Sequence, residues 1–141
     1  MKRLITFLLL LTFLSADHIS DTALSLGYQT KFTTALQKAK NENKLLMMVV
    51  VSNYCPWCRK FESTTLKNSN ISKAIKKDFI PLLINKDSAV YPQGYKVPGV
   101  PSVFFINPTN ETTLWRSFGY KTSSEFTKTL STAKQRFAPS L

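Results

Sequence analysis

The chain has 141 residues and a formal net charge of +11, from 19 Lys and Arg against 8 Asp and Glu. Its length favours one domain, and 43% apolar with 19% charged residues excludes a disordered tail. Two cysteines and one histidine exclude the multi-bridge scaffold of a small secreted protein and a closed four-ligand zinc site within one chain.

Residues 1–16 have the layout of a secretory signal peptide. Two basic residues precede an apolar run over residues 4–14, and small residues follow it. The run is too short for a membrane span, which needs roughly 20 residues. We therefore predict export and no integral membrane span after cleavage; an uncleaved anchor or a buried N-terminal helix is the alternative. Residues 17–29 show little pattern, so we expect a loosely ordered lead-in to a domain of residues 30–141.

The first half of this domain is predicted to contain a helix, a strand and a second helix, in that order. Apolar residues at helical spacing predict a helix over residues 30–43. The apolar run over residues 45–51 is rich in β-branched residues, which predicts a strand buried on both faces. The next helix is expected to begin at Cys55 and Pro56, because proline suits a first helical turn, and to run toward Leu66.

The second half combines a short helix, further strands and a closing helix. Asn70 is the expected cap of a helix over residues 71–77. Further strands are predicted over residues 79–84, 102–106 and 112–118, separated by a loop over 85–99 and a turn over 107–110. Thr122 and Glu125 have the spacing of a capping box that begins the last helix. This order predicts an α/β fold: a mixed central sheet of about four to five strands with helices on both faces.

Cys55, Pro56, Trp57 and Cys58 form a C-x-x-C pair at the predicted start of a helix. Disulfide exchange needs one thiolate to attack and a second thiol close enough to resolve the mixed disulfide, and this spacing supplies both. Unpaired N–H groups and the helix dipole favour a negative sulfur on the first cysteine. Pro56 stiffens the loop, and Trp57 offers an aromatic surface to a partner. A passive disulfide, a half zinc site shared between two chains and a pair of packing cysteines are the alternatives.

Two stretches of the chain resemble the thioredoxin superfamily. One is the segment 54–61 that contains the cysteines and follows a strand. The other is the segment 95–102, which is similar to the Y-x-V-x-G-x-P loop of that family and precedes a strand. By this resemblance Pro101 is a cis-proline that faces the cysteines, and the backbone of Val100 holds a partner's chain as an additional strand.

The closest resemblance is to small periplasmic thioredoxin-like proteins of bacteria. It implies a periplasmic thiol–disulfide oxidoreductase with no metal and no cofactor other than the Cys55–Cys58 disulfide. The implied partners are protein thiols and disulfides, with a membrane thiol carrier as the electron source of a reductase. A dithiol oxidase that introduces disulfides and a non-catalytic binding module are the alternatives. No pattern indicates nucleic-acid binding or a dimerisation element, so we expect a monomer.

One position departs from the family. Many thioredoxins have a buried carboxylate six residues before the first cysteine, whereas Val49 stands there in this chain, with no acidic residue between Glu42 and Glu62. Deprotonation of Cys58 therefore needs another group, such as water or a lysine. His18, the only histidine, is expected in the flexible lead-in, which argues against a cysteine–histidine hydrolase.

Overall fold

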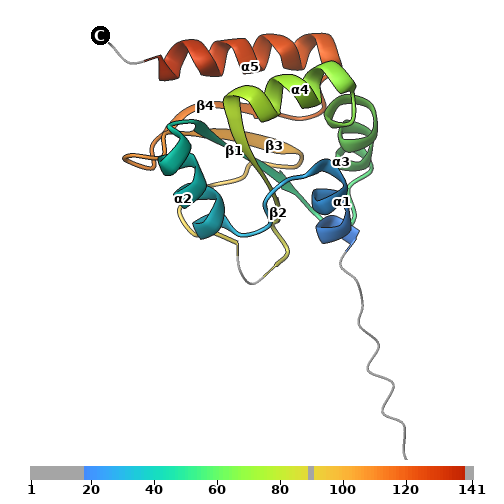
Figure 1. The fold of residues 1–141 in the computed structure, drawn as a ribbon. Helices are drawn as coiled ribbons and strands as arrows, with labels where there is room; N and C mark the ends of the chain where they lie inside the picture. Colours follow the sequence, from blue (N-terminus) through green and yellow to red (C-terminus); the bar gives the residue numbers. More distant parts are fainter. Residues whose placement is uncertain (1–17, 89–90, 139–141) are drawn as a thin grey trace, which may run out of the picture.

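The computed structural model describes residues 18–88 and 91–138, so the predicted signal peptide lies outside the described residues. Along the chain the elements are α1 (His18–Leu26), α2 (Phe32–Glu42), β1 (Leu45–Val51), α3 (Pro56–Lys60), the π-helix η1 (Phe61–Leu66), α4 (Ser69–Asp78), β2 (Phe79–Asn85), β3 (Ser102–Ile106), β4 (Thr113–Phe118) and α5 (Ser123–Phe137). Figure 1 shows the helices packed around a central sheet. Among the described residues, no helix is long and apolar enough to cross a membrane.

The central sheet has four strands in the order β2-β1-β3-β4. β1 pairs in parallel with β2 and antiparallel with β3, so that Val49 lies between Leu83 and Val103. β4 is the antiparallel partner of β3. Every residue of β1 and β2 is buried, which explains their continuous apolar sequences. The predicted mixed sheet of an α/β fold is therefore confirmed.

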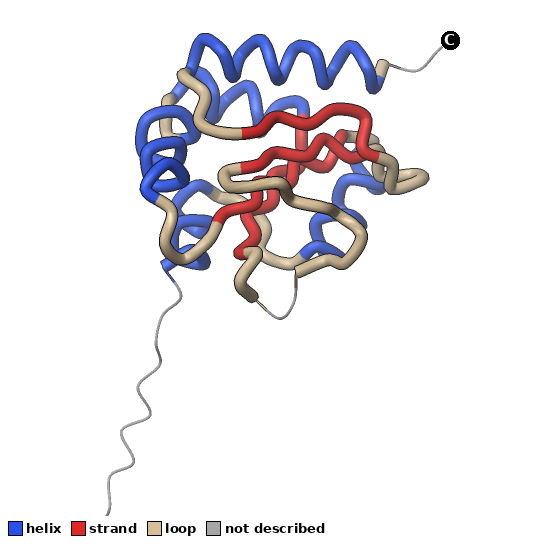
Figure 2. The backbone as a smooth tube through the Cα atoms, turned by 180° about the vertical axis from the view of Figure 1, so that it is seen from behind, coloured by secondary structure: helices blue, strands red, loops and turns tan. Residues whose placement is uncertain are grey.

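Successive residues of β1 point to opposite faces of the sheet. One face, which we call the helical face, is covered by α1, α3, η1, α4 and α5, and it receives Leu45, Met47, Val49 and Val51. The other, the loop face, is covered by α2 and the segment 91–100, and it receives Leu46, Met48 and Val50. In Figure 1, α4 and α5 lie together above the sheet and α2 lies below it. Figure 2 shows the connection between β2 and β3 crossing the sheet as a loop rather than as a helix.

Aromatic pairs fill the helical face. Phe61 of η1 meets Phe126 of α5 edge to face, with ring centroids 5.1 Å apart. Phe79 and Phe105, from β2 and β3, lie 5.5 Å apart. All four rings are buried, and rings of this size dominate the energetics of a core. They fix η1, and with it the segment that follows the cysteines, against the sheet.

Residues 17–29 are not a loosely ordered lead-in within the described range, so that expectation is wrong. Residues 18–26 form α1, which buries Ile19, Ala23 and Leu26 against the helical face. These three residues recur after four and three positions, the spacing of a helix with one apolar side. The short period was visible in the sequence but too brief to stand out from its polar surroundings.

Gln29 ties the end of this N-terminal segment to the outer edge of β2. Its N–H donates to the carbonyl of Pro81 at 2.9 Å, and its carbonyl accepts the N–H of Leu83 at 3.0 Å. The contact is an isolated parallel bridge rather than a strand. It nevertheless fixes α1 next to the sheet.

The helix that follows the cysteines changes its pitch. α3 ends at Lys60, and the chain continues without a break as the π-helix η1 to Leu66, where the sequence predicts the helix to end. π-Helical turns are rare and often lie at functional sites. The change of pitch rotates the residues of η1 relative to those of α3.

Side-chain caps begin α4 and α5. The cap of α4 is Asn68 rather than the predicted Asn70, because the Asn68 side chain accepts the N–H groups of Asn70 and Ile71. The helix therefore starts two residues earlier than expected. At α5 the predicted capping box is confirmed, since Thr122 and Glu125 each accept a hydrogen bond from the backbone of the other.

Candidate active site

The two cysteines lie where β1 leads into α3. Cys55 is the N-cap of α3, with φ −137° and ψ 92°, and Pro56 occupies the first turn as predicted. Cys55 and Cys58 are joined as a disulfide. The N–H of Cys58 donates to the Sγ of Cys55 at 3.1 Å. Cys55 is 7% exposed and Cys58 2%, so an approaching partner reaches the first sulfur more easily than the second.

This arrangement favours negative charge on Cys55 in the reduced state. The N–H of Cys58 already points at the Cys55 sulfur, and the dipole of the helical segment adds to its effect. Arg59 lies nearby and donates through Nη2 to the carbonyl of Asn53 at 3.2 Å, which holds a guanidinium beside the loop. Both effects stabilise a thiolate relative to a thiol.

The turn before Cys55 is anchored to the end of β2. The N–H of Asn53 donates to Oδ2 of Asp87 at 3.0 Å, and the Asn85 amide donates to Oδ1 of Asn53 at 2.8 Å. The N–H of Asp87 donates in turn to Oδ1 of Asn85. Because β2 is a buried strand of the central sheet, these bonds hold the cysteine loop in place relative to the sheet.

The segment before β3 has the conformation that the family resemblance implies. The Val100–Pro101 peptide bond is cis. The carbonyl of Pro101 accepts the N–H of Gly119 at 2.9 Å, and Ser102 Oγ donates to the carbonyl of Gly99 at 2.6 Å. Val100 packs against the core cluster that contains both cysteines. Within the described residues, no hydrogen bond uses the N–H or the carbonyl of Val100, so both are free to pair with another chain.

Aromatic side chains surround the cysteine loop on its solvent side. Trp57 is 57% exposed, and its ring centroid lies 5.7 Å from that of Tyr120. The Lys60 ammonium lies 5.1 Å from the Trp57 ring centroid and 4.9 Å from that of Tyr120. Tyr120 also shares a hydrogen bond of 3.3 Å with Thr64. Trp57 is therefore exposed but held in place, and Tyr120 is a site residue that the sequence reasoning missed.

Glu62 is a buried carboxyl group in the helix that follows the redox pair, and the sequence reasoning missed its burial. It follows Cys58 by four residues, which is about one helical turn, and it is 7% exposed. Burial raises the pKa of Glu62, while the charges of His18, Arg59 and Lys67 act in the opposite direction. The spacing after Cys58 was the available signal, but it does not reveal burial.

The expectation that His18 is flexible is also wrong. It begins α1, and its charge acts on Glu62. Val49 is fully buried in the same cluster as the cysteines, as its place in β1 implies. Within residues 18–88 and 91–138, no group of three or more His, Cys, Asp or Glu could hold a metal ion.

Comparison with known proteins shows what this chain is similar to. A family profile described as "Thioredoxin-like domain" matches residues 32–134. The chain is also 27% identical over 97 residues to the thiol:disulfide interchange protein DsbD of Colwellia psychrerythraea. That match covers 64% of this chain but only 16% of the relative, so the chain spans about a sixth of the length of this curated protein.

Solved structures share the fold. A thioredoxin from Thermus thermophilus superposes with a TM-score of 0.69 at 24% identity, over 79% of this chain and 89% of that one. The C-terminal domain of Neisseria meningitidis DsbD in its reduced form gives a TM-score of 0.58 at 18% identity, over 74% and 92%. At these identities the likeness concerns the arrangement of strands and helices around the cysteine loop.

Proposed function

We propose a direction, a compartment and residue roles for this chain, which belongs to the family of thioredoxin-like domains and is a thiol–disulfide oxidoreductase with the Cys55–Cys58 pair. In our proposal it is exported to the periplasm and reduces disulfides of protein partners. The observation that carries the exchange chemistry is the Cys55 sulfur at the start of α3, which already accepts the N–H of Cys58. A sulfur held in this way has a lower pKa, so a larger fraction of it is thiolate at neutral pH. The thiolate is the form that attacks a disulfide.

The proposed reaction has two exchanges. The Cys55 thiolate attacks one sulfur of the partner's disulfide, so that a mixed disulfide forms and the partner's other sulfur leaves as a thiolate and takes a proton. Cys58 then loses its proton and attacks the Cys55 sulfur, which restores the Cys55–Cys58 disulfide and releases the second partner thiol. The partner gains two electrons and this chain loses two. A thiol carrier of the membrane resupplies them in our proposal.

Glu62 is the group that we propose for the proton of Cys58. It lies about one helical turn beyond Cys58, and the position used by many thioredoxins carries Val49, which cannot accept a proton. Because burial raises the pKa of Glu62, its carboxylate is a stronger base than an exposed glutamate. The charges of His18, Arg59 and Lys67 act against this rise of the pKa and favour the carboxylate.

Val100, Pro101 and Trp57 are proposed to hold the partner. The free N–H and carbonyl of Val100 can pair with an extended segment as in a sheet. Trp57 offers a fixed aromatic surface beside the sulfurs. A segment bound between them would present its disulfide to Cys55.

A trapping experiment tests the exchange chemistry. In Cys58→Ser the mixed disulfide on Cys55 cannot be resolved, so covalent partners are expected to accumulate in the cell envelope and to disappear on reduction. The matched control, Cys55→Ser with Cys58 intact, is expected to trap few or none because Cys58 is buried. Failure of Cys58→Ser to trap any partner would support the non-catalytic binding module instead.

The reduction potential of the pair tests the direction. A value near the roughly −270 mV of thioredoxin supports a reductase, and a value near the roughly −120 mV of a strong dithiol oxidase overturns that direction.

Glu62→Gln tests the proton acceptor. We expect release of the mixed disulfide to slow by roughly a hundredfold at neutral pH, the low end for a lost general base, with little change in attack by Cys55.

A further inference from the structure

A groove lies on the loop face beside β4. It has a volume of about 690 Å³ and runs between Tyr95 and Lys96 on one side and the β4 residues Leu114 and Arg116 on the other, with Phe104 also lining it. The segment 91–100 covers the sheet up to this point with a loop, and the groove lies where that cover ends. It is separate from the cysteine loop and is not used in the exchange chemistry.

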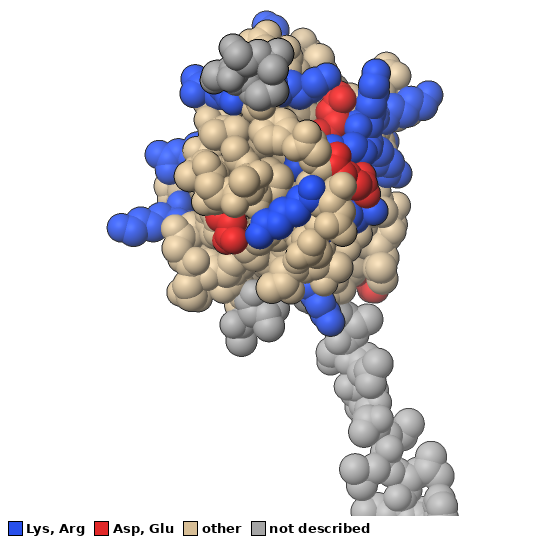
Figure 3. Space-filling view, turned by 60° about the vertical axis from the view of Figure 1, so that its left-hand side comes forward, with Lys and Arg blue, Asp and Glu red and all other residues tan. Residues whose placement is uncertain are grey.

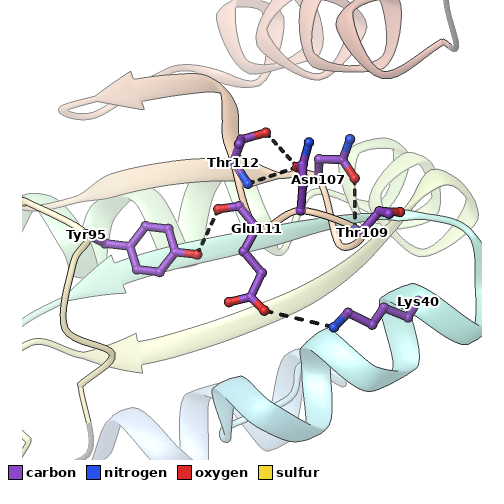
Figure 4. Close-up of polar contacts among 7 residues, drawn as sticks. Lys40, Tyr95, Asn107, Thr109, Glu111 and Thr112 are labelled. Atoms are coloured by element: carbon purple, nitrogen blue, oxygen red, sulfur yellow. Dashed lines mark hydrogen bonds and ion pairs between the residues drawn. The ribbon is translucent and has the colours of Figure 1, made fainter.

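The wall of the groove is already formed in the isolated chain. The ring of Tyr95 packs between Phe32 and Phe104, at centroid distances of 5.6 Å and 5.8 Å. Its hydroxyl donates to the carbonyl of Glu111 at 3.4 Å, and the carboxylate of Glu111 lies 3.9 Å from the ammonium of Lys40 (Figure 4). These contacts tie the loop to both α2 and the turn between β3 and β4. A ligand would therefore meet a preformed surface and lose little affinity to ordering it.

Two cations line the groove without an anionic partner. Lys96 and Arg116 are both exposed, and neither makes an ion pair with any residue in the described part of the chain. The acidic residue next to the groove wall, Glu111, is engaged with Lys40. Positive charge beside apolar rings, with the neighbouring carboxylate already paired, is complementary to a segment that carries carboxylates and apolar side chains.

The groove leads toward the loop that holds Val100. A smaller hollow of about 210 Å³ shares Phe104 and Arg116 with it and is also lined by Pro98 and Phe118. Phe118 is 55% exposed and lies against Gly99, where an added Cβ would come within 2.7 Å of its ring. The surface is thus continuous from the groove to the residue before Val100.

We infer that this groove binds an extended acidic segment of the protein substrate, next to the segment that carries the reactive cysteine. The inference rests on the proposed function and adds a substrate class to it: partners that carry carboxylates and an apolar side chain in an extended segment of about six residues. That length follows from β4, which has six residues, because an extended segment lying along it has nearly the same rise per residue.

An anionic membrane is a less suitable ligand for these two cations. Lys96 and Arg116 line a concave site, whereas a bilayer offers a flat surface. The other basic side chains are spread around the molecule with acidic groups among them, as Figure 3 shows for one side, rather than gathered in one plane. A groove is a better fit for a polypeptide.

Matched peptide probes test the inference. Each probe has one cysteine linked to thionitrobenzoate, so that attack of reduced Cys55 on the peptide sulfur releases a coloured thiolate. A six-residue extension on either side of the cysteine contains Glu and Leu, or Gln and Leu in the neutral probe. For exposed charge pairs we expect the acidic extension on one side to react about three- to tenfold faster, with an advantage that fades at high salt.

Variants then locate the effect. The double variant Lys96→Gln/Arg116→Gln is expected to bring the ratio of acidic to neutral rates close to one, and the control Lys73→Gln, on α4, to leave the ratio unchanged. An equal rate for both probes in the parent protein, or a ratio that survives the double variant, overturns the inference. The inference is also overturned if the double variant loses binding to phosphatidylglycerol vesicles but keeps the parent ratio of acidic to neutral probe rates.

Failure of the proposed function gives a different result. If neither probe is reduced, the proposed exchange reaction is wrong. The binding of cysteine-free versions of the two peptides then tests the proposed groove separately. Preference for the acidic peptide that is lost in the double variant then supports the groove, and equal binding overturns it.

Discussion

The two faces of the sheet use the same strands but are closed in different ways. On the helical face, α1, η1, α4 and α5 bury the odd-numbered residues of β1, and the aromatic pair of Phe61 and Phe126 joins helix to helix. On the loop face, one helix and the segment 91–100 cover the even-numbered residues, and Tyr95 and Phe104 border an open groove. The redox pair belongs to the first face and the proposed docking groove to the second.

This difference assigns the stability of the redox site to the helical face and the choice of protein partner to the loop face. A face closed by helices has little room to rearrange, which suits a disulfide whose geometry must persist through each cycle. A face closed by a loop leaves polar and aromatic side chains accessible to a partner. If this view is right, equivalent changes on the two faces will have unequal effects, and the following experiments measure them from the largest to the smallest.

The largest contrast is expected between two neighbours of β3 that point to opposite faces. Phe105 packs against Phe79 on the helical face, and Phe104 lines the groove on the loop face. Phe105→Ala should lower the free energy of unfolding by about 3–5 kcal/mol, because the cavity cannot collapse. Phe104→Ala should lower it clearly less, because the loop can relax into the space. Guanidinium denaturation of the oxidised proteins measures both, and equal losses would contradict the division.

A smaller effect is expected from the buried carboxyl group. Burial raises the pKa of Glu62 above its ordinary value of 4.5, so the folded chain holds this proton more tightly than the unfolded one. The stability that results is present below pH 4.5 and is lost as the pH rises through the folded-state pKa. Glu62→Gln should therefore be more stable than the parent at neutral pH and equal to it near the acidic end. Thermal unfolding of the oxidised protein across this range measures the difference.

Glu125 is the matched control, with the opposite sign. The backbone N–H of Thr122 and then its hydroxyl lower the pKa of Glu125, so its contribution is present above pH 4.5 and is lost as the pH falls through the folded-state pKa. Glu125→Gln should lose stability at neutral pH and approach the parent in acid. Parallel pH profiles for the two variants would show that burial of Glu62 is not the cause.

The smallest contrast concerns two tyrosine hydroxyls. Tyr28 is buried on the helical face, and within the described residues its hydroxyl has no hydrogen-bond partner. Tyr91, on the loop face, donates to the carbonyl of Tyr95 at 2.6 Å. Tyr28→Phe should raise the free energy of unfolding by about 1 kcal/mol, and Tyr91→Phe should lower it by about the same amount. Urea midpoints at equal slope decide the signs, and a loss in both variants would point to a water molecule bound to Tyr28.

The parts of the fold that the sequence predicted are those whose local pattern is strong. The apolar run of β1 has no plausible alternative to a buried strand, and the C-x-x-C pair with Pro56 identifies both a helix start and a redox site. Two asparagines on either side of Ser69 give a weaker signal, so Asn70 is the expected cap where Asn68 caps α4. Local sequence does not distinguish two caps of the same residue type.

The parts that could not be predicted depend on contacts across the chain. Glu62 is a surface residue by composition, and its burial depends on how η1, the helix that carries it, packs within the core of the helical face. The groove exists because the segment 91–100 ends its cover before β4, which no local pattern encodes. Lys60 likewise lies between Trp57 and Tyr120, which are 63 positions apart in the sequence.

The bridge at Gln29 has a consequence for how the protein behaves among its copies. An open sheet edge invites another strand to pair with it, which leads to aggregation. Along the outer edge of β2, Phe79 donates its N–H to Ile75, Pro81 has no N–H, and Leu83 donates to Gln29. A foreign strand therefore finds no free donor at these three successive outward positions. The N-terminal segment thus protects the sheet on the side away from the groove, and β4 is left as the edge where strand pairing can occur.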